Sequence, residues 1–250
     1  MPQNPWLAID AATPPSARAQ RLRRAWESFV HEGRLEEVRP PIAESWQRSY
    51  AAGVDPVGPC VAPALADAEA AAPRWRAHPL ATAAPLIRDC LSSTAVAAGH
   101  LIAVSDADGM LLWIEGPARL RFEAADSMNF TEGAGWSECA AGTNGIGTAL
   151  AARHAVQVFA AEHFHEVLHR WTCAAAPVHD PDTRRLLGIV GVTGMLSTVH
   201  PHTFGCIVAT ARAVESELRC LMLERDAQRR ASDARLEAPL RPLPGPTSVR

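Results

Sequence analysis

Apolar residues recur at helical spacing in two segments near the start of the chain. In residues 17–30 they include Leu22, Trp26 and Phe29, at intervals of three and four residues, which predicts an amphipathic helix. The stretch PPIAESWQRSYAAG, residues 40–53, has prolines at its beginning and a glycine at its end. This punctuation is typical of a helix. We expect the Pro- and Ala-rich segment that follows to be a linker that leads into a further helix.

Strand patterns dominate the middle of the chain. The stretch HLIAVSDADGMLLWIEG, residues 100–116, contains two short β-patterned runs around an Asp-Gly turn, which predicts a hairpin. After a polar loop, GTNGIGTALAARH (142–154) predicts a helix with Thr143 or Asn144 as its N-cap. We then expect a strand at 155–160, a short helix at 162–170 and two further strands at 172–180 and 186–194. This order predicts an α+β domain with a mostly antiparallel sheet.

A long helix is expected at residues 201–229. Its apolar residues run from Phe204 to Leu221 in steps of three and four, which is the spacing of a coiled-coil seam. A helix packed on its own sheet would show the same pattern over so short a length. We expect a homodimer built from this helix together with the N-terminal helix around Trp26 and Phe29.

Composition excludes several classes of function. The net charge of the 250 residues is −3, from 24 basic and 27 acidic side chains, which gives no general attraction for nucleic acid. All basic residues are Arg, and without Lys neither a Walker A loop nor Schiff-base chemistry is available. The sequence shows no signal-peptide pattern and no apolar run that could span a bilayer. We therefore expect a cytoplasmic protein that contacts neither nucleic acid nor membrane directly.

The letters HEVLH at residues 165–169 match the H-E-x-x-H motif of zinc proteases. On a helical wheel, Phe164 and Val167 belong to a buried stripe, whereas His165 and His169 lie more than about 90° from its centre and would face water. We interpret the match as a chance pairing of histidines, and a zinc hydrolase is the least favoured function.

Four stretches, taken in order, resemble one family. VRPPIAESWQRSYAAGVDP (38–56), VSDADGMLL (104–112), AGTNGIGTALAARHAVQVFAAEHF (141–164) and WTCAAAPVHDPDTRRLLGIVGVTG (171–194) are similar to the sensory half of the acetoin-catabolism type of bacterial transcription regulators. That half is a GAF domain. The resemblance implies a GAF fold, with a sheet of about six antiparallel strands, helices on one face and a ligand cavity on the other.

In that family an ATPase module and a helix-turn-helix usually follow the GAF domain, and neither pattern occurs in this sequence. We therefore expect a protein partner to carry the DNA-binding or output function. The expected organisation is a flexible arm at 1–16, an N-terminal helical segment at 17–80, the GAF sensory domain with its long helix at 81–229 and a Pro-rich disordered tail at 230–250.

The resemblance places a small-molecule site where its last two blocks meet around the open face of the sheet. The expected cavity walls are Trp136, Thr143, Asn144, His163, Phe164, Trp171 and Cys173. Several of these residues allow more than one interpretation. Trp136 either closes an apolar pocket or anchors its loop, and Asn144 is a helix cap or points its amide into the cavity. His163 is a structural histidine or a ligand of haem or metal, and Cys173 is an inert thiol or a redox sensor paired with Cys139.

Together these observations predict a non-enzymatic sensor of a small molecule or of redox state that acts in transcription regulation through a partner. No pattern identifies a cofactor, and no metal site is expected. The alternative is a thiol-dependent GAF enzyme of the free methionine sulfoxide reductase kind. That chemistry would require an accessible, electropositive niche for the thiol.

Overall fold

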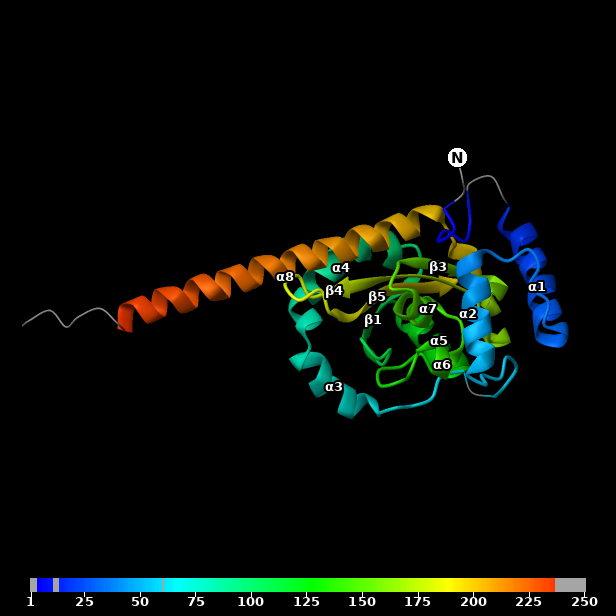
Figure 1. The fold of residues 1–250 in the computed structure, drawn as a ribbon, viewed down its shortest axis with the longest axis horizontal. Coiled ribbons are helices and arrows are strands. Elements are labelled where there is room, and N and C mark those ends of the chain that lie inside the picture. The colour runs from blue at the N-terminus through cyan, green and yellow to red at the C-terminus, as the bar shows by residue number, and fades with distance from the viewer. Residues whose placement is uncertain (1–3, 11–13, 60, 237–250) are drawn as a thin grey trace, which may run out of the picture.

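The computed structural model describes residues 4–10, 14–59 and 61–236. Its centre is an antiparallel sheet with the strand order β2-β1-β5-β4-β3 (Figure 1). The strands are β1 (His100–Asp106), β2 (Leu111–Glu115), β3 (Val156–Phe159), β4 (Trp171–His179) and β5 (Leu186–Met195). The predicted α+β class and antiparallel pairing are confirmed. The prediction of about six strands is wrong for the described residues, which form five.

Helices surround this sheet and account for most of the remaining chain. They are α1 (Pro15–Glu32), α2 (Pro40–Ala51), α3 (Ala68–Ala77), α4 (Ala84–Leu91), α5 (Ala118–Met128), α6 (Glu138–Ala141), α7 (Gly145–Ala152) and α8 (Pro201–Leu236). Short turns of 3₁₀- or π-helix are η1 (Pro79–Ala83), η2 (Ser92–Val96), η3 (Ala160–Glu162), η4 (Glu166–Arg170) and η5 (Leu196–Thr198). The helices predicted at 17–30, 40–53, 142–154 and 201–229 are confirmed as α1, α2, α7 and α8. No helix in the described part of the chain is long and apolar enough to cross a bilayer.

The two faces of the sheet have different partners, because alternate side chains of a strand point to opposite sides. On β4, Ala174 and Val178 belong to the core between the sheet, α4 and α8. Trp171 and Ala175 belong to the larger core on the other face, which also includes Trp46 of α2. The candidate cavity lies on this second face.

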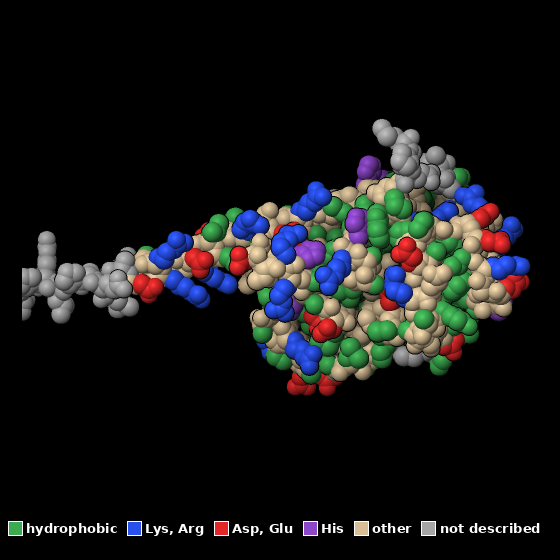
Figure 2. All heavy atoms as spheres, viewed as in Figure 1, with side chains coloured by type: hydrophobic (Ala, Val, Ile, Leu, Met, Phe, Trp, Pro, Cys, Tyr) green, Lys and Arg blue, Asp and Glu red, His purple; other side chains and the backbone are tan. Residues whose placement is uncertain are grey.

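The long helix α8 uses its apolar seam within its own chain. Ile207, Val214 and Leu218 are buried in the core that α8 shares with α4 and the sheet. Beyond about residue 222 the helix projects from the domain (Figure 1). Charged side chains cover much of this projecting part (Figure 2). Trp26 and Phe29 of α1 are also buried in the chain's own core, so these side chains are not available for the homodimer surface expected from them. The homodimer itself stays a prediction.

Both edges of the sheet are partly covered. At the β3 edge, the Gln157 amide donates to the Trp6 carbonyl (3.0 Å), and the Trp6 ring stacks on His154 at 4.1 Å. Part of the segment expected as a flexible arm thus packs against β3. The disordered tail expected at 230–250 is wrong for residues 230–236, which belong to α8, and residues 237–250 lie outside the described residues. At the β2 edge, the Leu111 amide donates to the Ala134 carbonyl (2.9 Å). Residues 133–135 lie where a sixth strand would begin but form only isolated bridge contacts.

Two local predictions fail. The segment expected as a polar loop contains α5, which follows Pro117 and ends at Asn129 in the left-handed conformation. Its pattern is weak because only Ala124 and Met128 are buried along it. The short helix expected at 162–170 is replaced by an extended stretch between the turns η3 and η4. The wheel drawn for a continuous α-helix consequently does not apply there.

Candidate functional site

A buried cavity lies against the face of the sheet that α8 does not cover. Its volume is about 10 Å³, which is room for about one water molecule. Its walls come from the sheet, from the end of α5, from the start of α7 and from the segment between β3 and β4. The lining residues are Ala103, Met128, Phe130, Trp136, Asn144, Gly145, Ile146, His163, Leu168, Trp171, Cys173, Ala174, Ala175, Gly191, Val192 and Thr193.

Strand alternation and one glycine bring β4 and α7 together at the cavity. Trp171 and Cys173 point to the same face of β4 because they are two residues apart. Helix α7 begins directly above this strand, and a Cβ atom on Gly145 would lie 2.8 Å from Cys173 Cβ. A larger residue at position 145 would therefore push α7 away from the sheet and change the cavity.

Asn144 fixes the start of α7 and the loop that carries Trp136. Its side-chain oxygen accepts a hydrogen bond from the Gly147 amide (2.8 Å), as an N-cap does. Its Nδ2 donates to the Trp136 carbonyl (3.0 Å) and to the Gly142 carbonyl (2.8 Å). The side chain is almost fully buried. The cap interpretation is confirmed, and the amide also holds the Trp136 loop in place.

Three ring nitrogens of cavity-wall residues lack a hydrogen-bond partner within the described part of the chain. They are Trp136 Nε1, Trp171 Nε1 and His163 Nε2, and all three are buried. A buried polar atom without a partner destabilises a fold by about 1–3 kcal/mol. Each of these unsatisfied groups therefore calls for an explanation, and all three belong to side chains that line the cavity.

The chemistry of His163 follows from its surroundings. Its Nδ1 lies 2.9 Å from the Ala160 carbonyl, and since a carbonyl only accepts, Nδ1 carries the hydrogen. Burial lowers the pKa of His163 to about 4, so the ring is neutral near pH 7. Nε2 is then an acceptor. Burial also raises the pKa of the Cys173 thiol to about 11, so this thiol is uncharged near pH 7 as well.

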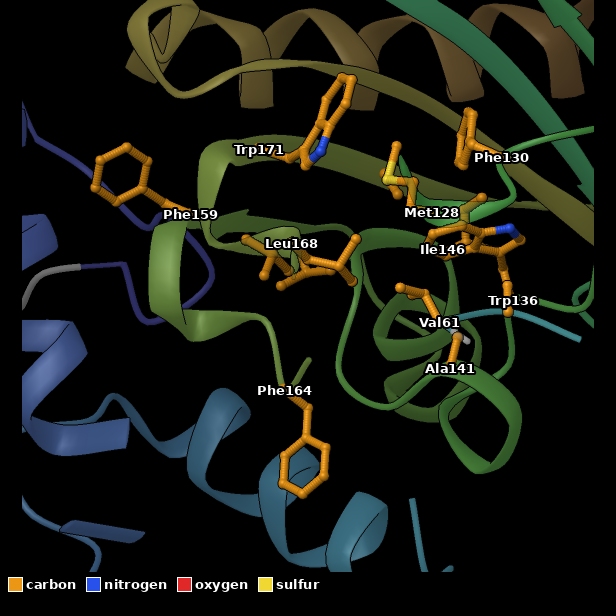
Figure 3. Close-up of a cluster of buried hydrophobic side chains, with 14 of the residues drawn as sticks. Val61, Met128, Phe130, Trp136, Ala141, Ile146, Phe159, Phe164, Leu168 and Trp171 are labelled. Atoms are coloured by element: carbon orange, nitrogen blue, oxygen red, sulfur yellow. The ribbon is translucent and has the colours of Figure 1, made fainter. Parts of the chain in front are cut away.

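Five of the seven residues predicted for the site line the cavity: Trp136, Asn144, His163, Trp171 and Cys173. The other two do not. Thr143 is buried against α2, where its hydroxyl accepts a hydrogen bond from Ser45 (2.7 Å). Phe164 packs edge-on against Phe29 of α1, with ring centroids 6.4 Å apart. Figure 3 shows Phe164 apart from the group that contains Trp136 and Trp171.

Sequence reasoning missed some of the cavity walls. Met128 and Phe130 lie at the end of α5 and just after it, in the segment expected as a loop. Leu168 lies in η4, where its burial matches the expected apolar stripe. The proposed partner of Cys173 is also absent from the wall, since Cys139 is exposed and its sulfur lies 3.1 Å from Ser137 Oγ.

The H-E-x-x-H residues are arranged differently from the sequence expectation. His165 is buried, and its Nε2 lies 2.8 Å from the Gly58 carbonyl, whereas Val167 is 38% exposed. The expectation that His165 faces water is wrong, because the segment turns as a 3₁₀-helix. Burial, followed by the neighbouring His163, lowers the pKa of His169 to about 3. No group of three His, Cys, Asp or Glu that could hold a metal ion occurs among residues 4–10, 14–59 and 61–236.

Comparisons with known proteins agree with the resemblance at a coarser level. A family model described as "MimR, N-terminal domain" matches residues 15–216. A Rhodococcus erythropolis protein described as an uncharacterized 47.3 kDa protein in the thcA 5′ region is 42% identical over 94% of this chain and 55% of its own length. The acetoin dehydrogenase operon transcriptional activator AcoR of Bacillus subtilis is 36% identical over 82% of this chain and 34% of its own.

Among solved structures, the E. coli DhaR(N)–DhaL complex contains a chain that superimposes with a TM-score of 0.68 at 21% identity, over 79% of this chain and 66% of that one. At this identity the likeness shows the fold alone. The chain spans between about a third and about half the length of these two curated relatives.

Proposed function

We propose a function on the premise that the chain belongs to the MimR N-terminal domain family, which its match over residues 15–216 shows. The chain is the sensory part of a transcription regulator. It binds a small uncharged molecule in the cavity beside β4 and passes the signal to an output part or partner. The observation that carries this proposal is a set of three ring nitrogens, Trp136 Nε1, Trp171 Nε1 and His163 Nε2. They have no hydrogen-bond partner among the described residues and belong to side chains that line one cavity.

The three nitrogens define the polar pattern of the ligand. The two indole N–H groups of Trp136 and Trp171 need acceptors, and the neutral His163 ring needs a donor. A molecule with one carbonyl and one hydroxyl group carries two acceptors and one donor, which is the number and kind of groups that the three nitrogens need. A hydroxyketone such as acetoin has this chemistry, and the name of one relative refers to the acetoin dehydrogenase operon.

The cavity also favours an uncharged ligand. Its described lining contains no Asp, Glu or Arg, and both titratable walls, His163 and Cys173, are neutral near pH 7. A charged ligand would lose its hydration without gaining an ionic partner, which is strongly unfavourable. The apolar walls, among them Met128 and Ile146, instead favour a short hydrocarbon skeleton.

The enzymatic alternatives are less well supported. A thiol with a raised pKa is a weak nucleophile because the thiolate is the reactive form, and burial raises the pKa of Cys173. The relative AcoR is a transcriptional activator, which favours regulation over catalysis. We also propose that the protein is cytoplasmic and that the domain is a GAF domain. Sensing of redox state is the alternative to sensing of a small molecule.

Isothermal titration calorimetry tests the binding site with a panel of small probes. We expect acetoin to bind more tightly than acetone, which lacks the hydroxyl donor, and pyruvate to give no heat because of its charge. Trp136→Phe and Trp171→Phe each remove one donor and keep an aromatic ring, so each weakens acetoin binding about fivefold. The matched control is Trp113→Phe, since Trp113 stacks on Trp75 of α3 with centroids 5.5 Å apart, outside the cavity lining. No heat with acetoin, or equal binding by all variants, contradicts the proposal.

A further inference from the structure

We propose that the helix pair α1–α2 holds a lid over the cavity, and that a ligand larger than water weakens this attachment when it binds. The lid is defined as residues 160–170, from η3 to η4. The part of the proposal that concerns ligand rests on the proposed function. The attachment itself rests only on the contacts within the chain, so the two parts can fail separately.

The lid has one side on the cavity and the other on the helix pair. His163 and Leu168 project from the lid into the cavity wall, and the lid leads directly into Trp171 of β4. Its opposite side faces α1 and α2, where Phe164 contacts Phe29 of α1. If the lid moves outward from the cavity, it therefore moves directly against α1 and α2.

Two indole groups hold the backbone of the lid. Trp26 of α1 donates its Nε1 hydrogen to the Phe164 carbonyl at 2.7 Å, and Trp46 of α2 donates to the Glu162 carbonyl at 2.8 Å. Both indoles are buried, and so are the carbonyls that they satisfy. The stretch at residues 163–165 lies between the two 3₁₀ turns of the lid. Its backbone is also held by the Phe164 amide, which donates to the Thr143 carbonyl at 3.1 Å.

A buried ion pair adds to this attachment. The Glu162 carboxylate is fully buried and accepts two hydrogen bonds of 2.7 Å from Arg39, the residue that precedes α2. Arg18 of α1 approaches the same carboxylate at 3.4 Å. The Arg39 guanidinium also donates to the Gln157 carbonyl of β3. The start of α2, the lid and the edge strand are thereby joined through one side chain.

The size of the cavity requires some wall to move when an organic molecule enters. The present volume of about 10 Å³ holds about one water molecule, whereas a molecule of four carbons and two oxygens is several times larger. The sheet wall is fixed by continuous pairing of β4 with β5 over residues 171–178. The lid lacks such pairing, and its shift would lengthen the bonds from Trp26 and Trp46. Ligand binding then weakens the attachment of the lid to α1 and α2. Loss of that attachment must strengthen ligand binding by the same factor, because the coupling is reciprocal.

Hydrogen exchange with mass spectrometry tests the attachment without any ligand. The variants Trp26→Phe and Trp46→Phe each remove one indole donor and keep an aromatic ring. Each should speed amide exchange in residues 163–170 about fivefold, and the double variant about 25-fold, if each bond has the usual net strength. The control is Phe29→Leu, which loosens packing in the same core but removes no hydrogen bond to the lid. Amides of β5 report global unfolding in every variant.

The proposed attachment is overturned if amide exchange in the lid rises as much in Phe29→Leu as in Trp26→Phe. It is also overturned if amide exchange in β5 rises by the same factor as in the lid. If the double variant does not fold, the two single variants carry the same comparison.

The ligand experiment uses acetoin as the probe. The double variant should bind acetoin about 25-fold more tightly than the unchanged chain, by reciprocity, and bound acetoin should speed exchange in α1. Binding without either effect overturns the coupling. A chain that gives no binding heat with acetoin contradicts the proposed function while leaving the ligand-free comparison decisive for the lid.

Discussion

Removal of the Asn144 side chain should destabilise the fold more than the loss of an ordinary polar residue. Asn144→Ala deletes the cap of α7, which is worth about 1 kcal/mol. It also leaves the Trp136 and Gly142 carbonyls without their amide donor, at about 1 kcal/mol or more for each buried group. The expected loss is about 3 kcal/mol, a large part of the 5–15 kcal/mol that is typical of a domain.

The assay is urea unfolding followed by tryptophan fluorescence, supported by thermal unfolding. A loss of about 3 kcal/mol should lower the midpoint temperature by about 6–12 °C for a chain of this size. Asn144→Ser keeps a cap oxygen but no amide donor, so it should recover about 1 kcal/mol of the loss. Asn4→Ala is a matched surface control, since the Asn4 side chain is exposed and accepts a hydrogen bond from the Trp6 amide. It should change stability by less than about 0.5 kcal/mol.

The reasoning is refuted if Asn144→Ala loses less than about 1 kcal/mol. Equal stability of the Ser and Ala variants would show that the cap contributes nothing to α7. A variant that is destabilised as expected should also loosen the Trp136 loop, because the Asn144 side chain bonds both the Trp136 carbonyl and the start of α7. Faster amide exchange around residues 133–137 would report this effect.

Three further predictions follow from the burial pattern. Because burial lowers the pKa of His163 to about 4 and of His169 to about 3, their stabilising effect is complete above pH 6.5 and is lost as the pH falls toward these values. Urea titrations should show a loss of roughly 4 kcal/mol between pH 7 and pH 5 from the two rings; equal stability at both pH values would contradict it. The buried Cys173 thiol, whose pKa is raised to about 11, should react with iodoacetamide more slowly than the exposed thiols, as mass spectrometry of the modified peptides can measure. In α8, Leu218→Glu should lower the unfolding temperature because Leu218 is buried, whereas Leu223→Glu, at a side chain 60% exposed, should leave it unchanged in thermal unfolding.

The sequence predicted best those features that depend on neighbouring residues. The hairpin of β1 and β2 follows from its Asp-Gly turn, and the pairs Val104–Trp113 and Ile102–Glu115 confirm it. The cap at Asn144 likewise depends on atoms only three residues away. Such features are set by turn and cap chemistry, which a short window of sequence contains.

Features that depend on distant partners were less accessible. The apolar seam of α8 is the same whether it meets its own sheet or a second copy, and only the structure shows Val214 and Leu218 in the chain's own core. The segment around His165 was misread because a contact with the distant Gly58 carbonyl stabilises a conformation that helical periodicity does not describe. The resemblance places Phe164 at the cavity because it lies where the last two blocks meet, but which face it occupies depends on the packing of α1.

The central claim is that Trp136 and Trp171 donate hydrogen bonds to a small molecule in the cavity, and their indole N–H signals test it most directly. The chain contains seven tryptophans, so a nitrogen–hydrogen correlation spectrum recorded during an acetoin titration can resolve these two from the others after assignment by Trp→Phe variants. We predict that both signals shift downfield and saturate together, whereas the signal of Trp113, which lies outside the cavity lining, stays in place. Saturating acetoin that leaves the Trp136 and Trp171 signals unchanged would contradict the claim.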